Sequence, residues 1–145
     1  MPNVARMSFN LAVLLIEEES GRDRNLAHGM IVGAHVREDI DILGDRYDHA
    51  STVTEARKLC LERKYDVIVT KTRDSSGKLL GPVIAHYKKL WDQDKAIIVG
   101  VGTDGQENDW NGTKPDYYFD KYSDGVFYTG GKFHDLLKKE FRSKR

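Results

Sequence analysis

Short, uninterrupted apolar runs recur along the chain in a pattern that is typical of buried β-strands. Residues 11–16 read LAVLLI, and residues 65–70 (YDVIVT) and 96–101 (AIIVGV) repeat the pattern with many β-branched side chains. Residues 116–120 (DYYFD) predict a further strand, and residues 46–50 (RYDHA) predict a weaker one. Continuous apolar strands of this kind belong in a sheet that is covered on both faces.

Helical periodicity lies between these strands. Thr52 and Glu55 have the spacing of a capping box, which predicts a helix start. Gly81 followed by Pro82 predicts another, because proline suits the first helical turn. A last helix is expected to begin near Gly131. The apolar positions at helical spacing in these three segments are Val53, Ala56, Leu59 and Cys60, then Val83, Ile84, Tyr87, Leu90 and Trp91, and finally Phe133, Leu136, Leu137 and Phe141.

The alternation of strands and helices predicts parallel βαβ units with right-handed crossovers. We expect one doubly wound α/β domain over residues 1–145, with five parallel strands, helices on both faces and a disordered segment at residues 1–8. A first helix is expected within residues 24–37, although two glycines there weaken the pattern. In such sheets the functional site lies at the carboxyl ends of the central strands.

Composition is consistent with this fold and narrows the chemistry. Hydrophobic residues make up 39% of the chain and charged residues 32%, as in ordinary globular proteins. Lys+Arg and Asp+Glu are equal at 23 each, so we expect no general attraction to nucleic acid or to an anionic membrane. The single cysteine, Cys60, excludes an internal disulfide. The apolar runs are too short to span a bilayer, and we expect a cytoplasmic protein.

Charged and hydroxyl side chains follow the predicted strands. They are Glu17, Glu18 and Glu19 after residues 11–16, Lys71, Thr72, Arg73 and Asp74 after residues 65–70, Thr103 and Asp104 after residues 96–101, and Asp120 and Lys121 at the end of the last strand. Because the carboxyl ends of parallel strands meet at one edge of a sheet, we expect these side chains to share one crevice.

In this order and spacing, the strand-end blocks resemble the receiver domains of two-component response regulators. VLLIEEES places Glu17 and Glu18 on the acidic pair of the family, and DYYFDKY places Lys121 on its lysine. AIIVGVGT places Thr103 on the hydroxyl residue of the family, with Gly102 as the alternative position. KYDVIVTK resembles the third block, but Lys71 falls where the family has its phosphate-accepting aspartate. The resemblance implies a flavodoxin-like sheet with strand order 2-1-3-4-5.

Lys71 changes the chemistry that the resemblance implies. Phosphorylation of a receiver needs an ionised carboxylate and Mg²⁺, which binds through carboxylate oxygens and water. We expect the Lys71 ammonium to pair with Glu17 or Glu18 in a pocket without Mg²⁺ or another cofactor. The sequence therefore predicts a non-enzymatic pseudo-receiver that binds a protein partner or a second copy of itself, independently of aspartyl phosphorylation. Asp74 is the alternative phosphate acceptor.

Two features leave alternatives open. The glycines of residues 100–105 (GVGTDG) predict, in the alternative, a phosphate- or nucleotide-binding enzyme on the same kind of sheet, although no Walker or Rossmann motif is present. The segment of residues 104–115 (DGQENDWNGTKP) lacks helical periodicity, so we expect the fourth helix of the family to be shortened or replaced by a loop. Trp110 in this segment either anchors a protein partner or packs within the loop.

Overall fold

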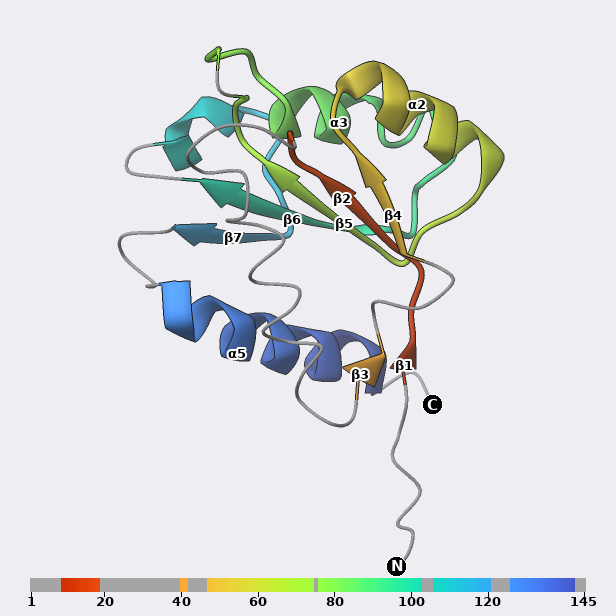
Figure 1. Cartoon of the computed structure of the whole chain (residues 1–145), viewed down its shortest axis with the longest axis vertical. Coiled ribbons are helices and arrows are strands. Elements are labelled where there is room, and N and C mark those ends of the chain that lie inside the picture. Colours follow the sequence, from red (N-terminus) through yellow and green to blue (C-terminus); the bar gives the residue numbers. More distant parts are fainter. Residues whose placement is uncertain are drawn as a thin grey trace, which may run out of the picture.

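The predicted strands pair into one parallel sheet with the order β4-β2-β5-β6-β7 (Figure 1). The computed structural model describes residues 9–18, 40–41, 47–74, 76–102, 106–120 and 126–142. The five strands are β2 (Val13–Ile16), β4 (Tyr47–Ala50), β5 (Val67–Lys71), β6 (Ile97–Gly102) and β7 (Tyr117–Asp120). Numbered among themselves along the chain, they have the order 2-1-3-4-5, which confirms the predicted topology.

A second, two-stranded sheet was not predicted. In it β1 (Phe9–Asn10) pairs in parallel with β3 (Ile40–Asp41). Each strand has only two residues, so neither leaves a periodic pattern in the sequence.

Two helices cover one face of the large sheet (Figure 1). The first, α2 (Val53–Glu62), begins as predicted, because the Thr52 hydroxyl accepts a hydrogen bond from the Glu55 backbone N–H at 3.1 Å. The Glu55 carboxylate in turn accepts the backbone N–H of Ser51 at 3.1 Å. Ala56 and Cys60 are buried against the sheet, in agreement with the predicted apolar face.

The second of these helices, α3 (Gly81–Tyr87), is shorter than predicted. The chain leaves the helix after Tyr87, and Leu90 is 74% exposed, so its assignment to the buried stripe was wrong. Trp91 is buried as predicted, with its ring stacked on Tyr87 at a centroid distance of 5.4 Å. A turn therefore brings Trp91 to the core although the helix itself has ended.

The opposite face of the sheet is covered by α5 (Val126–Leu137), which continues into a π-helical turn, η2 (Lys138–Arg142) (Figure 1). The helix begins at Val126, earlier than the predicted start near Gly131. Its predicted apolar residues Phe133, Leu136 and Leu137 are buried in the core, and Phe141 packs against that core. Helices on both faces are thereby confirmed, whereas the helix expected within residues 24–37 and the segment of residues 1–8 lie outside the described residues.

The connection between β6 and β7 has no α-helix in its described residues. It contains one short 3-10 helix, η1 (Gln106–Trp110), which confirms the predicted replacement of a fourth helix. In the described ranges, no helix is both long and apolar enough to cross a membrane.

Candidate functional site

Glu17 and Lys71 lie at the carboxyl ends of two neighbouring strands. β2 and β5 pair in register with Ile16 opposite Thr70, so Glu17 and Lys71 occupy the next step along each chain. The Glu17 backbone N–H donates to the Ala50 carbonyl at 3.0 Å, which continues the ladder beyond the last residue of β2. Because side chains alternate along a strand, Glu17 and Lys71 project from the same face as Leu15 and Val69, the face that α5 covers.

Both of these ionisable side chains are withdrawn from solvent. Glu17 is 1% exposed and Lys71 is 8% exposed, whereas Glu18 is only partly buried. A buried charge without a compensating partner costs several kcal/mol, roughly 3–5, so burial of an acid and a base on one face favours their pairing. Among the described side chains, Arg63 forms an ion pair with Asp48 and Arg73 forms one with Asp109, whereas the pairing of Lys71 with Glu17 or Glu18 stays a prediction.

Two side chains of β4 extend this buried polar group. His49 lies opposite Leu15, and its Nε2 is 2.5 Å from the Glu17 carbonyl oxygen. Tyr47 lies two residues earlier on the same face, where burial and, to a smaller extent, the charge of Glu17 raise its pKa to about 12. Neither residue was singled out in the sequence, because their relation to Glu17 depends on the pairing of β4 with β2.

Thr72, the first residue after β5, connects the strand to two other elements. Its backbone N–H donates to the Val101 carbonyl at 2.8 Å, and its carbonyl accepts the backbone N–H of Leu80 at 2.8 Å. Its hydroxyl donates to the Val101 carbonyl at 3.1 Å and accepts the indole N–H of Trp110 at 3.0 Å. Thr72 is fully buried, and apart from its place after an apolar run no sequence pattern predicts this role.

Trp110 is not an exposed anchor for a partner. It is 1% exposed, and its ring fills the space above two glycines, Gly81 at the start of α3 and Gly100 in β6. A Cβ atom at Gly81 would lie 2.3 Å from the ring, and one at Gly100 would lie 2.6 Å from it. The expected exposure of Trp110 is therefore not found, and its ring packs against α3 and β6 and not within its own loop.

Asp74 stabilises a tight turn after β5. Its carboxylate accepts hydrogen bonds from the backbone N–H groups of Ser76 and Lys78 at 2.9 and 2.8 Å, and from the Ser76 hydroxyl at 2.7 Å. Desolvation is the largest single influence and raises the pKa of Asp74, but these hydrogen bonds and the charge of Lys78 together outweigh it and hold the pKa below its ordinary value. The same oxygen, Oδ1, accepts all three bonds, so this carboxylate stabilises the turn.

Arg73 joins this turn to η1. Its Nε donates to the Asp109 carboxylate at 2.8 Å, and its guanidinium also donates to the Gly77 carbonyl at 2.5 Å. The hydrogen bond from Arg73 holds the pKa of Asp109 below its ordinary value. Hydrogen bonds of Arg73 therefore stabilise the loop after β5 internally and also join it to the connection between β6 and β7.

Two of the predicted site residues, Thr103 and Lys121, lie outside the described residues. β6 and β7 end one residue before them, at Gly102 and Asp120, and these two residues are paired in the sheet. The structure therefore brings Glu17 and Lys71 together on one face, while the contributions of Thr103 and Lys121 stay predictions.

The glycines of β6 are occupied by the protein's own side chains. Trp110 fills the space at Gly100, and a Cβ atom at Gly102 would lie 2.3 Å from the Tyr118 hydroxyl and 2.9 Å from the Thr72 hydroxyl. η1 has only five residues and is not an α-helix, so it offers no helix dipole to a phosphate. At these two positions the absence of a side chain serves internal packing and does not open the backbone to a phosphate.

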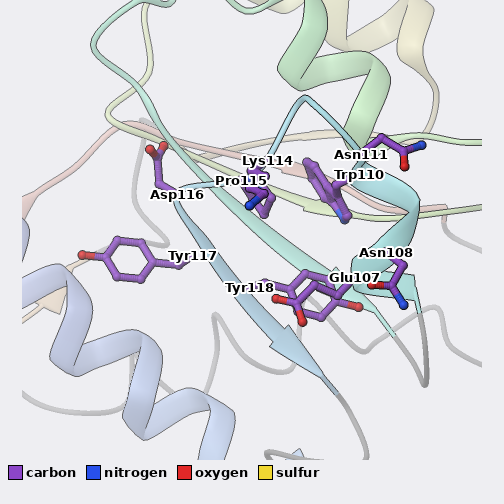
Figure 2. Close-up of a pocket in the computed structure, with 9 residues that line it drawn as sticks. All are labelled: Glu107, Asn108, Trp110, Asn111, Lys114, Pro115, Asp116, Tyr117 and Tyr118. Carbon is purple, nitrogen blue, oxygen red and sulfur yellow. The ribbon is translucent and has the colours of Figure 1, made fainter.

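A cavity of about 490 Å³ lies between η1 and the start of β7 (Figure 2). It is lined by polar residues of η1 and of the following loop, including Glu107, Asn108 and Lys114, and by Trp110, Tyr117 and Tyr118, of which Tyr117 turns its ring away toward α5 (Figure 2). Of the predicted site residues only Trp110 takes part. This cavity is therefore separate from the group around Glu17 and Lys71.

The side chains at the strand ends do not fit a magnesium ion. Mg²⁺ prefers carboxylate oxygens and water in octahedral geometry. Here β2 offers Glu17 and Glu18, but β5 offers an ammonium group at Lys71 in place of a third carboxylate. Within the described part of the chain, no three His, Cys, Asp or Glu side chains gather closely enough to hold a metal ion.

Comparison with known proteins identifies the fold. No protein-family model matches the chain, and no curated protein matches its sequence. Among solved structures, the receiver domain of a Francisella response regulator has a TM-score of 0.65 at 15% identity, over 94% of this chain and 100% of that one. A Hahella chejuensis response regulator has a TM-score of 0.61 at 17% identity, over 89% of this chain and 93% of that one. The receiver domain of the putative response regulator NarL from Mycobacterium tuberculosis has a TM-score of 0.59 at 9% identity, over 88% and 97% of the two chains. The chain therefore has the fold of the response-regulator receiver domains.

Proposed function

We propose that this protein is a receiver-like signalling module that acts by binding another protein and does not depend on aspartyl phosphorylation. The observation that carries the proposal is the placement of Lys71, a buried lysine at the carboxyl end of β5, on the same face of the sheet as the buried Glu17. A phosphate acceptor at this point must be a carboxylate that can attack phosphorus, and lysine supplies none.

The electrostatics of this position support the proposal. An ammonium and a carboxylate about 4 Å apart attract by about 4 kcal/mol at an effective dielectric constant near 20, before desolvation removes much of that energy. With Lys71 as an internal cation, the charge that Mg²⁺ would neutralise is already balanced. We therefore propose a pocket that neither binds Mg²⁺ nor accepts a phosphoryl group.

Asp74 is a poor substitute acceptor. Its Oδ1 accepts three hydrogen bonds within the turn, and these bonds stabilise the ionised form. Phosphorylation of Asp74 would remove the carboxylate charge that strengthens these bonds and would therefore weaken the turn between β5 and α3.

A protein-binding role fits the neutral net charge, and we propose that the module works in the cytoplasm.

The single cysteine, Cys60, is buried on α2, where burial raises its pKa to about 11. This thiol is therefore structural and unreactive, as expected of a small buried side chain.

The test uses the full chain with Mg²⁺ and acetyl phosphate, a small-molecule phosphodonor, followed by intact mass spectrometry. We expect no phosphoryl group on the native protein. The variant Lys71→Asp restores a carboxylate at the end of β5. The variant Lys71→Asn is its matched control, because asparagine has the size of aspartate but no carboxylate nucleophile. Uptake of one acid-labile phosphoryl group by the native chain would contradict the proposal, and Asp74→Asn would then show whether Asp74 carries it.

A further inference from the structure

We propose that an exposed apolar patch at the ends of α2 and α3 binds an acidic segment of a protein partner. Three large hydrophobic side chains are conspicuously exposed in the described ranges, and all three belong to these helices or the turn after them. Leu61 is 57% exposed, Tyr87 is 37% exposed and Leu90 is 74% exposed. We call these three residues the α2–α3 patch. The proposal deepens the proposed function and rests on it in so far as the ligand is a protein.

One buried side chain holds the ends of the two helices together. Gln93, which is 2% exposed, donates from Nε2 to the carbonyls of Cys60 at 2.9 Å and Arg63 at 2.8 Å, and its Oε1 accepts the backbone N–H of Tyr65 at 3.0 Å. Figure 1 shows α2 and α3 side by side above the same face of the sheet. The turn that carries Leu90 is therefore fixed against the end of α2 that carries Leu61.

The aromatic member of the patch is held in place before any ligand binds. The ring of Tyr87 stacks on buried Trp91 with an angle of 11° between the planes, and His86 packs edge-on against Tyr87 at a centroid distance of 4.9 Å. A side chain that is already ordered loses little conformational entropy on binding. Large, rigid aromatic residues of this kind are typical anchors of protein interfaces.

The charges around the patch determine the kind of partner. Arg57 and Lys58 precede Leu61 by four and three positions, so they share its side of α2, and Lys88 and Lys89 lie between Tyr87 and Leu90. Residues 57–61 and 87–90 contain these four cations and no carboxylate. In a chain whose net charge is zero, this local excess of positive charge complements an acidic partner.

Charges on and beside the patch disfavour two other occupants. A second copy of this chain would bring the four cations of one patch against those of the other. An anionic membrane would meet carboxylates beside the patch, at Glu62, Asp92 and Asp94, of which Asp92 is bound to Lys64 at 3.2 Å. A discrete acidic segment with one or two apolar side chains can avoid these carboxylates, because it contacts a smaller area than a membrane does.

The test follows backbone amide chemical shifts of the full chain during titration with a synthetic acidic amphipathic helix that carries leucine on one face. Two comparison peptides keep the length, one with the acidic residues replaced by lysine and one with leucine replaced by serine. We expect shifts on α2 and on the turn after α3 with the acidic peptide, and clearly weaker binding of both comparison peptides. No shifts at the patch, or equal binding of the basic peptide, would overturn the proposal.

Variants locate the effect. We expect Lys58→Glu combined with Lys89→Glu to weaken binding at least about tenfold, since reversed charges repel the peptide. The matched control reverses two exposed cations on the α5 side, Lys132→Glu with Lys139→Glu, and is expected to leave binding unchanged. Equal losses in both pairs would mean that only overall charge matters, and preferential binding to vesicles of phosphatidylglycerol would identify a membrane instead; either result overturns the proposal. These outcomes are independent of phosphoryl uptake, which tests the proposed function through Lys71.

Discussion

Trp110 donates its indole N–H to the hydroxyl of Thr72 over 3.0 Å, across 38 residues of sequence. The hydroxyl of Thr72 donates in turn to the Val101 carbonyl. The bond joins η1 to the end of β5, and it places the Trp110 ring where Gly81 and Gly100 leave room for it. The packing of the sheet on this side therefore depends on one aromatic ring in a connection that has only a 3-10 helix in its described residues.

Adding a methyl group beneath the Trp110 ring is expected to destabilise the fold. A Cβ at Gly81 would lie 2.3 Å from the ring and one at Gly100 would lie 2.6 Å from it, so Gly81→Ala and Gly100→Ala must displace the ring, at a cost of roughly 1–3 kcal/mol each. Denaturant unfolding measures the change. Gly112→Ala is the matched control, because its Cβ would meet no atom within 4 Å, and an equal loss there would contradict this explanation.

Removal of two tyrosine hydroxyls is expected to have opposite effects on stability. Among the described residues, the Tyr118 hydroxyl is buried, and its interaction with the Thr72 hydroxyl falls short of hydrogen-bond geometry because that hydroxyl already bonds Val101 and Trp110. Tyr118→Phe should therefore leave the free energy of unfolding unchanged or raise it by up to about 1 kcal/mol. The Tyr65 hydroxyl donates to the Asp48 carboxylate at 2.7 Å. Tyr65→Phe should therefore lower the free energy of unfolding by about 1–3 kcal/mol. Thermal and denaturant unfolding of the two variants measure these changes. A large loss of stability in Tyr118→Phe would show that the Tyr118 hydroxyl is hydrogen-bonded.

The cap of α2 should be measurable on its own. Thr52→Ala removes the hydroxyl that accepts the Glu55 N–H and is expected to cost about 1 kcal/mol. Thr54→Ala, two residues later and exposed, is the matched control, since it makes the same chemical change inside the first turn. Alanine has the higher helix propensity, so Thr54→Ala should lose no stability, and an equal loss in both variants would contradict the capping explanation.

Stability is expected to fall at alkaline pH because several tyrosines resist ionisation in the folded state. Burial raises the pKa of Tyr47 and of Tyr118 to about 12, and a hydrogen bond to Glu140 raises that of Tyr117 to about 12. An unfolded tyrosine ionises near pH 10, so the stability that these groups contribute is complete below about pH 10 and is lost as the pH rises through about 12. Phenolate absorbance of the native chain and of the urea-unfolded chain measures both pKa values. Ionisation of every tyrosine near pH 10 in the folded protein would contradict the prediction.

The strands and their order could be predicted because each strand is buried on both faces and leaves a continuous apolar run. The start of α2 followed from Thr52 and Glu55 alone, since a cap is a local interaction. The end of α3 could not be predicted from the sequence, because Leu90 and Trp91 both fit the helical period. Only tertiary packing distinguishes the exposed leucine from the buried tryptophan.

The candidate site was predicted in part for the same reason. Glu17 and Lys71 follow strands that the sequence marks, and parallel pairing then brings them together. The burial of Trp110 and the role of Thr72 depend on a contact between segments that are distant in the sequence, and no local pattern records it. The polar composition around Trp110 favoured an exposed loop, whereas the vacant space above two glycines determined its burial.

The position of the Trp110 ring has a consequence for how the protein opens locally. The ring contacts the first residue of α3, the middle of β6 and the residue after β5, so none of these segments can separate from the others without exposing it to water. Their amide hydrogens should therefore exchange with solvent through one shared opening, with a common free energy, as in a single cooperative unit. Amides in the exposed first turn of α2 lie outside this set of contacts, and they should exchange independently of the tryptophan.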